Sequence, residues 1–279
     1  MSKTTVGFIG GGNMTRAIAG GLLDKNFDPR NIAIAEPVES QRQVLVDSLP
    51  DVFVSEDNAA VVARSQCVVL AVKPQVLAEV CRELAAAVKK HRPLIVSIAA
   101  GPRIDDIDAW LGSGNAVIRV MPNQPALIGR GVSGIFGNAR TSADQIAVAT
   151  DILSAVGPVV TVARETDIDA VTAVSGSGPA YFYLLIDMLL KSGVELGLDE
   201  STASRLALET AAGATLLAQQ SGEAMETLIA RVRSPGGTTA AALDELEARG
   251  IRDIFTAALT AARDRATDLA DAAHESARD

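Results

Sequence analysis

The sequence predicts an α/β domain with a doubly wound, mainly parallel sheet, followed by an all-helical domain. In the first half, short β-branched runs alternate with segments of helical spacing. A glycine-rich turn follows the first of these runs, and Val-rich runs cease after Ala163. Strands that alternate with helices imply right-handed crossovers and a sheet covered on both faces. We expect a domain boundary near Arg164, which gives domains of residues 1–163 and 164–279.

The predicted strands are short, apolar and rich in β-branched residues. They are residues 6–9, 32–35, 52–54, 67–72, 94–99 and 116–120, with 131–136 and 159–162 at the sheet edge. Apolar residues recur at helical spacing in the segments between them. The resulting helices are 14–25, 40–48, 76–90, 104–111 and 143–155.

The second half reads almost entirely as helix. Its predicted helices are 166–174, 180–196, 199–220, 224–231, 238–249 and 251–273, and the polar tail 272–279 is expected to lack order. Residues 181–190 are apolar nearly all round. Such a helix is usually buried on every side, which a small domain achieves by pairing with a second copy. A central core helix in a monomer is the alternative.

Charge and apolar run length exclude several classes of partner. The chain has 34 acidic and 25 basic residues, a formal charge of −9, so nucleic acid is an unfavourable partner. No apolar run approaches the ~20 residues that cross a bilayer. The longest, 180–190, is broken by Asp187, and we expect no membrane association. The start of the chain has no signal-peptide pattern.

The cysteines and histidines are few and isolated. Cys67 and Cys81 belong to no CxxC or Cys/His cluster, which argues against a disulfide scaffold and against a metal site. His91 and His274 lie in polar surroundings, so a histidine-based catalytic triad is not expected. These features predict a cytoplasmic protein without a metal.

The glycine-rich turn predicts a dinucleotide cofactor. Gly10 allows a tight turn between strand and helix, and Gly12 lets a pyrophosphate approach the N–H groups of the helix start. Thr15 occupies the third glycine position of the common pattern, and we expect it to loosen the packing of helix on strand. A glycine turn without a ligand is the alternative.

Residues after the other strands bear on the choice of cofactor. Glu36 can accept hydrogen bonds from a ribose 2′-hydroxyl and repel a 2′-phosphate, which favours NAD(H). Arg42 could pair with that phosphate, so NADP(H) stays open. The loops 71–74 and 98–101 carry small residues over which a flat dinucleotide can lie. Lys73 could be a cofactor-side residue or simply a solvated helix start.

Two small-residue turns lie in the helical half. Residues 233–239 read Arg-Ser-Pro-Gly-Gly-Thr-Thr, and Pro235 with two glycines would gather N–H groups and hydroxyls at a helix start. That arrangement suits a small carboxylate, and a capped turn without a ligand is the alternative. Residues 175–179 form a second turn, with Pro179 at the first helical position. Without a nearby histidine base, we interpret it as a close backbone approach where the domains meet.

Taken in order, these signatures resemble the pyrroline-5-carboxylate reductases. The resemblance runs from Val6 to Leu269 and rests on residues 8–14, 71–74, 97–101, 119–123, 174–181 and 234–239. The chain departs from the pattern at Gln124, usually threonine, and at Ala224 and Met225, which replace a common His-Pro. These departures could tune the substrate pocket.

The resemblance implies a Rossmann domain, a helical domain that intertwines into dimers, and often a ring of five dimers. It also implies NAD(P)H-dependent reduction of L-1-pyrroline-5-carboxylate to L-proline. The positions it assigns to the cofactor are Ile9, Gly10, Gly11, Gly12, Asn13, Met14, Glu36, Asn58, Ala71, Val72, Lys73, Pro74, Ile98, Ala99 and Ala100. Ser234, Gly237 and Thr238 fall on substrate positions, and Thr239 on the hydroxyl that meets the imine nitrogen.

The residue inventory suits this chemistry. A protonated imine is a strong electrophile, so hydride transfer needs positioning more than a strong base. A related enzyme acting on a hydroxyacid would generally need a lysine in the helical domain, where only Lys191 occurs. The same architecture could also reduce another imine, and a non-catalytic dinucleotide sensor is the alternative from a different class.

Overall fold

The computed structural model describes residues 4–276, which form two compact units. The first contains the residues up to Ser177 together with those from Ala262 onward, and the second contains Gly178–Ala261. The predicted boundary near Arg164 differs from this division. Residues 165–177 belong with the sheet because Asp169 forms an ion pair with Arg119 in the sheet, at 3.0 Å.

An eight-stranded sheet forms the centre of the first unit, in the order β3-β2-β1-β4-β5-β6-β7-β8. Every neighbouring pair is parallel except β6 and β7, so the predicted mainly parallel sheet is confirmed. The strands are β1 Val6–Ile9, β2 Ile32–Ala35, β3 Phe53–Ser55, β4 Cys67–Leu70, β5 Leu94–Ser97, β6 Val117–Met121, β7 Ser133–Gly137 and β8 Val159–Thr161.

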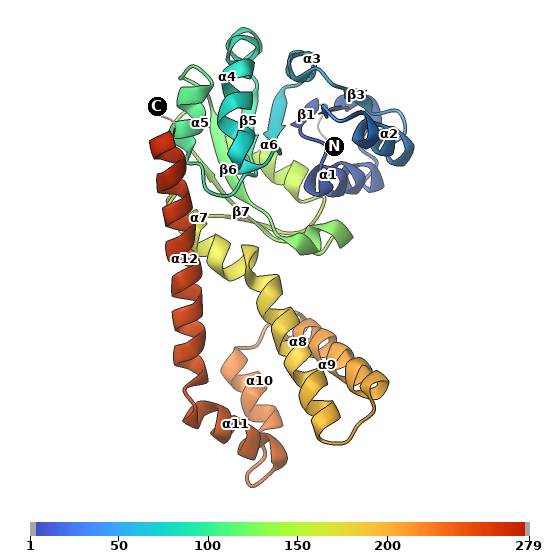
Figure 1. Cartoon of the computed structure of the whole chain (residues 1–279), viewed down its shortest axis with the longest axis vertical. Coiled ribbons are helices and arrows are strands. Elements are labelled where there is room, and N and C mark those ends of the chain that lie inside the picture. The colour runs from blue at the N-terminus through green and yellow to red at the C-terminus, as the bar shows by residue number, and fades with distance from the viewer. Residues whose placement is uncertain (1–3, 277–279) are drawn as a thin grey trace. The chain divides into compact units, whose positions relative to one another are not determined.

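Helices cover both faces of this sheet (Figure 1). They are α1 Asn13–Asp24, α2 Glu39–Ser48, α3 Asn58–Arg64, α4 Pro74–His91, α5 Ile104–Trp110, α6 Ala143–Leu153 and α7 Asp167–Val171. The sequence did not predict α3. It is a short helix that begins because the Asp57 carboxylate accepts hydrogen bonds from the N–H groups of Ala59 and Ala60.

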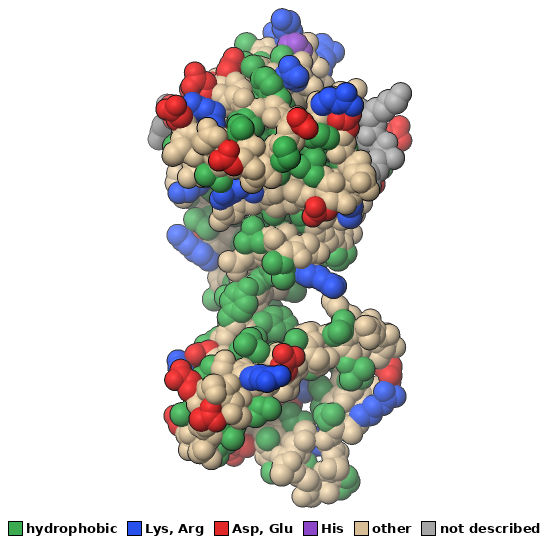
Figure 2. Space-filling view, turned by 90° about the vertical axis from the view of Figure 1, so that its right-hand side faces the viewer, with side chains coloured by type: hydrophobic (Ala, Val, Ile, Leu, Met, Phe, Trp, Pro, Cys, Tyr) green, Lys and Arg blue, Asp and Glu red, His purple; other side chains and the backbone are tan. Residues whose placement is uncertain are grey.

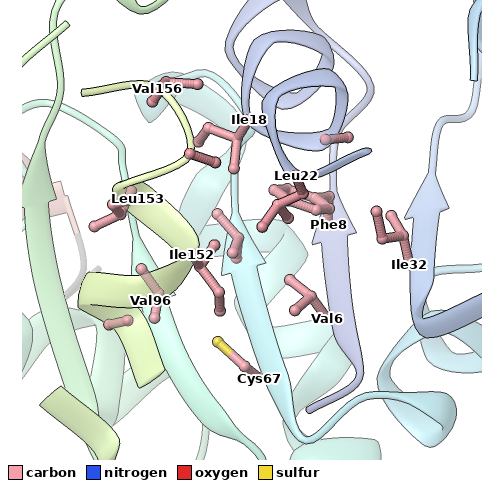
Figure 3. Packing of buried hydrophobic residues seen from close by; sticks show 14 of the residues in the cluster. Val6, Phe8, Ile18, Leu22, Ile32, Cys67, Val96, Ile152, Leu153 and Val156 are labelled. Carbon is pink, nitrogen blue, oxygen red and sulfur yellow. The ribbon is translucent and has the colours of Figure 1, made fainter. Parts of the chain in front are cut away.

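Two apolar cores result, one on each face. Phe8 of β1 packs with Ile18 of α1 and Ile152 of α6 on one side, as Figure 3 shows. On the other side, Leu70 of β4 packs with Leu77 of α4. Successive strand residues point to opposite faces, so the central strands contribute to both cores and every residue of β1 is buried.

The second unit is helical, as predicted. It contains α8 Gly178–Glu195, α9 Glu200–Ser221, α10 Met225–Val232, α11 Thr238–Ala248 and the start of α12 Ile251–Ser276. Only Gly178 of α8 is buried within the chain, whereas Phe182, Leu184 and Leu189 are more than half exposed. Within one chain, α8 is therefore not the all-round buried helix that its composition predicts.

Two further expectations concern the membrane and the end of the chain. Among residues 4–276, one helical run, Asp167–Glu195, is long enough to cross a membrane and reaches a mean hydropathy of 1.2. Length and composition do not separate a membrane span from a helix whose apolar faces meet protein. At the end of the chain, residues 272–276 continue α12 instead of lacking order, while 277–279 lie outside the described residues.

Candidate functional site

The predicted cofactor residues follow the carboxyl ends of five neighbouring parallel strands. In spatial order these strands are β3, β2, β1, β4 and β5. Asn58 is the first residue of the helix after β3, and Glu36 follows β2. Residues 9–14 end β1 and open α1, residues 71–74 follow β4, and residues 98–100 follow β5. The fold therefore brings all of them to one edge of the sheet, where α/β proteins bind their ligands.

The glycine turn is held between two strands. Gly10 has a φ of 102°, a conformation that favours glycine, and a Cβ there would lie 2.8 Å from the Ala71 carbonyl oxygen. The Gly10 N–H donates to the Ala35 carbonyl at 2.8 Å, and the Ala71 N–H donates to the Ile9 carbonyl at 2.8 Å. The turn consequently has a defined position over the sheet edge.

Thr15 stabilises the glycine turn through its hydroxyl. Its Oγ1 donates a hydrogen bond of 2.6 Å to the Gly10 carbonyl, and the residue is completely buried. The expectation that Thr15 loosens the packing of α1 is wrong, because its hydroxyl links the first helical turn to the glycine turn.

The start of α1 fits an anionic group. Gly12 is the N-cap, so no side chain caps the helix, and the first turn contains no acidic residue. A Cβ on Gly12 would meet no atom within 4 Å. The first N–H groups of a helix have no partner within the helix and carry a partial positive charge. Open space and uncapped N–H groups together match what the pyrophosphate of a dinucleotide requires.

Glu36 contributes to this cradle through its carboxylate. Oε2 accepts a hydrogen bond of 3.0 Å from the Gly11 N–H, and Oε1 accepts one of 3.0 Å from the Val38 N–H. The side chain is thus fixed beside the glycine turn. Each carboxylate oxygen can accept more than one hydrogen bond, so capacity for a ribose hydroxyl remains.

Arg42 is engaged by the protein backbone. Its Nη1 donates to the carbonyls of Glu36 and Pro37, at 3.0 and 2.7 Å. Its Nη2 lies 3.4 Å from a carboxylate oxygen of Glu56. The guanidinium therefore stabilises the loop after β2, and a ligand phosphate would have to compete with these contacts.

Two other loops complete the edge. Lys73 is exposed and is the N-cap of α4, with Pro74 at the first helical position. Ala99 is buried, and Gly101 just beyond it has a φ of 103°. Because Lys73 is exposed at the start of α4, it has the position of a solvated helix start, on the same edge as the glycine turn.

The proposed substrate turn lies in the second unit. The Gly237 N–H donates to the Ser234 carbonyl at 3.0 Å, and Gly236 has a φ of 70°. Pro235 followed by a residue of positive φ is typical of a type II turn. A Cβ on Gly237 would collide with the Ser234 hydroxyl. Glycine at position 237 therefore allows the Ser234 hydroxyl to lie close to the start of α11, which a larger residue would prevent.

The start of α11 resembles that of α1. Gly237 is its N-cap, no side chain caps it, and its first turn carries no acidic residue. Thr238 and Thr239 are its first two residues, the former exposed and the latter half-buried. Uncapped N–H groups beside two hydroxyls suit a small carboxylate. That this turn and the glycine turn serve one active site stays a prediction.

Sequence analysis missed the roles of Arg119 and Asn123. Arg119 of β6 is 2% exposed, and its guanidinium contacts Asp169 at 3.0 Å and Glu165 at 3.5 Å. The Asn123 amide donates to the Ser175 carbonyl at 3.1 Å and accepts from the Val132 N–H at 2.9 Å. An arginine within an apolar strand was the available signal for the first of these.

Thiol and metal chemistry have no visible support in the described residues. Burial raises the pKa of both Cys67 and Cys81 to about 12, so their thiols are not nucleophiles at neutral pH. Within residues 4–276, no three His, Cys, Asp or Glu side chains gather as a metal site would require.

Comparison with known families places both halves of the chain. The family described as pyrroline-5-carboxylate reductase dimerisation matches residues 165–269. The family described as NADP oxidoreductase, coenzyme F420-dependent, matches residues 5–101, which include the glycine turn.

Individual relatives extend over the whole chain. Pyrroline-5-carboxylate reductase of Pseudomonas aeruginosa is 45% identical over 271 residues, covering 97% of this chain and 98% of its own length. The solved reductase of Coxiella burnetii has a TM-score of 0.92 at 36% identity, over 96% of this chain and 99% of that one. The Plasmodium falciparum enzyme, solved with NADP bound, has a TM-score of 0.84 at 28% identity, over 97% and 99%. The chain belongs to the pyrroline-5-carboxylate reductase family.

Proposed function

We infer that the chain catalyses NAD(P)H-dependent reduction of L-1-pyrroline-5-carboxylate to L-proline, the last step of proline biosynthesis. The observation that carries this inference is the 45% identity to a pyrroline-5-carboxylate reductase over 97% of the chain. The uncapped helix starts at Gly12 and Gly237 support it, because the reaction needs one site for the anionic cofactor and one for the anionic substrate.

The edge of the sheet holds the cofactor in this proposal. The N–H groups at the start of α1 bind the pyrophosphate, Glu36 accepts hydrogen bonds from the adenosine ribose, and residues 71–74 and 98–100 border the nicotinamide half. The bound cofactor supplies the hydride. Asn58, at the start of α3, borders the adenine side because β3 is the outermost strand there.

The start of α11 holds the substrate. Its N–H groups, with Ser234, Gly237 and Thr238, bind the carboxylate of the cyclic imine. The Thr239 hydroxyl hydrogen-bonds the ring nitrogen and passes a proton to it through water, since a threonine hydroxyl alone is too weak an acid. The imine carbon accepts the hydride, and the ring nitrogen becomes the amine of proline.

The helical region carries the dimerisation domain of the family, and the chain forms a homodimer. We propose that the exposed apolar side chains of α8 are covered in that dimer, which explains the hydropathy of this helix without a membrane. A ring of five dimers and a cytoplasmic location are the further expectations.

A paired assay tests the reaction. The protein is mixed with pyrroline-5-carboxylate and either NADH or NADPH, and the absorbance of the reduced nicotinamide is followed. Decay with at least one cofactor, with proline as the product, supports the proposal. No decay with either would favour a dinucleotide sensor, and decay only with other imines would favour a different imine reductase.

The same assay addresses cofactor preference. Glu36 places a carboxylate where the 2′-phosphate of NADP(H) would lie, so we propose a higher kcat/KM with NADH. Glu36→Gln removes the charge but keeps an oxygen that accepts from the Gly11 N–H. The variant is expected to shift the ratio of the two kcat/KM values toward NADPH, and an unchanged ratio would remove Glu36 from cofactor selection.

A further inference from the structure

A pocket of about 470 Å³ lies at the amino ends of β5 and β6. Its walls come from the turn before β5, the turn before β6 and the segment after β7. Because β5 and β6 run in the same direction as β1, their amino ends lie at the sheet edge opposite the glycine turn. The pocket is therefore separate from the proposed cofactor site.

Three cations line this pocket. They are Lys89 and Arg92, at the end of α4, and Arg140, after β7. No acidic residue is among the lining residues. Within the described part of the chain, Lys89 and Arg92 form no ion pair. Figure 2 shows Lys and Arg side chains gathered around a histidine at the top of the view, where α4 ends in Figure 1. In a chain of net charge −9, this concentration of positive charge is a local exception.

The carboxylate paired with Arg140 is already in use. Asp108 lies 3.7 Å from Arg140, and it accepts hydrogen bonds from the N–H groups of Gly114 and Asn115, at 3.2 and 2.8 Å. The Asn115 amide donates a third, also at 2.8 Å. Asp108 thus fixes the turn before β6 and offsets only part of the charge of Arg140.

Helix stabilisation accounts for only some of these cations. Basic residues in the last turn of a helix interact favourably with its dipole, which explains Lys89. Arg140 comes from a different segment and faces the same pocket, so the dipole of α4 does not explain it. Arg92 is held in a left-handed conformation with a φ of 48°, which fixes the direction in which the chain leaves α4.

We propose that this pocket binds a small polyanion carrying phosphate or carboxylate groups. Guanidinium groups bind either group through paired hydrogen bonds, and Lys89 adds a third positive charge. The volume falls within the range of about 300–1,000 Å³ that is usual for small-molecule sites. Such a ligand occupies a site that is not part of the reaction.

Calorimetry on the enzyme saturated with NADH and L-proline tests the proposal, because these ligands then block anion binding at the glycine turn and at the start of α11. Pyrophosphate and citrate serve as the two probes at low ionic strength. We expect saturable binding of one probe per chain, with a dissociation constant in the millimolar range or tighter. The preferred probe identifies the ligand chemistry as phosphate or carboxylate.

Matched variants decide whether the pocket is the site. Lys89→Gln with Arg140→Gln removes two cations of the pocket, and both side chains are exposed, so folding is not at risk. Lys90→Gln with Arg82→Gln removes the same charge from exposed positions of α4 that do not line the pocket. The first pair is expected to weaken binding at least about tenfold, the second less than twofold, and neither to alter kcat with pyrroline-5-carboxylate. No saturable binding of either probe, or equal weakening by both pairs, would overturn the proposal.

Discussion

The two units bury their apolar residues to very different extents. Every residue of β1, β2, β4 and β5 is buried, whereas α8 buries only Gly178. The sheet unit completes its own core because helices cover both faces. The helical unit leaves apolar side chains such as Phe182 and Leu184 uncovered, each more than half exposed. The contrast teaches that one unit completes its core within a single chain, whereas in our proposal the other completes its apolar packing in the dimer.

Despite this difference, the units share one ligand-binding device. Helices α1 and α11 both begin after a glycine N-cap, and neither has a side-chain cap or an acid in the first turn. Each helix start therefore offers N–H groups to an anion. In our proposal the sheet unit uses them for the cofactor pyrophosphate and the helical unit for the substrate carboxylate.

The largest effect is expected at the buried ion pair of the sheet unit. Arg119→Met leaves Asp169 and Glu165 without their cation, and should lower the free energy of unfolding by about 3–5 kcal/mol. Urea unfolding is followed through Trp110, the single tryptophan, for the sheet unit and through far-ultraviolet circular dichroism for the helical unit. Arg249→Gln breaks an exposed pair of the helical unit and should cost less than about 1 kcal/mol. Equal losses would contradict the contrast in burial.

Thr239 tests the division of roles between the units. Thr239→Ala should lower kcat/KM for pyrroline-5-carboxylate by ~10²-fold, the size typical of a lost proton-transfer partner. NADPH affinity, measured by fluorescence titration, should stay unchanged because the cofactor residues lie in the sheet unit. Thr239→Ser keeps the hydroxyl and serves as the control. Unaltered turnover in the alanine variant would remove Thr239 from the mechanism.

The exposed apolar face of α8 tests the need for a second copy. Leu184→Asp places a charge where a leucine would be buried in the dimer, which should raise the dimer dissociation constant by roughly 10- to 100-fold. Sedimentation velocity over a dilution series measures this constant. Val46→Asp, at a half-exposed position of α2 in the sheet unit, should leave it unchanged. If the dimers of both variants dissociate equally, the exposed face of α8 is not part of the dimer interface.

Substitutions at two glycines distinguish the loss of space for a ligand from backbone strain. Gly12→Ala fills the open space before α1, so the NADPH dissociation constant should rise at least about tenfold while the free energy of unfolding falls by less than about 1 kcal/mol. Gly10→Ala instead forces a Cβ toward the Ala71 carbonyl at a positive φ, and should cost about 1–3 kcal/mol of stability. Isothermal titration and thermal unfolding distinguish the two. Unaltered NADPH binding by Gly12→Ala would argue against a pyrophosphate at this position.

Local patterns predicted most of the sheet. The bounds of β1 and β2 agree with the predicted runs, since an apolar β-branched segment between polar turns has few other stable arrangements. The same patterns missed α3, whose apolar stretch is short and whose start depends on the Asp57 cap. They also misjudged Thr15, because its hydrogen bond to Gly10 becomes visible only once the turn is folded.

Periodicity and glycine placement were enough to predict the fold class and the two ligand-binding turns, and the order of the motifs indicated the family and the remaining candidate residues. These features are local in the chain, so they can be read from neighbouring residues. The tertiary structure decided which groups meet across long distances, such as Glu36 with Gly11 and Arg119 with Asp169. It also decided that α8 remains exposed in one chain. Burial and electrostatic pairing depend on segments brought together from far apart, which no local pattern encodes.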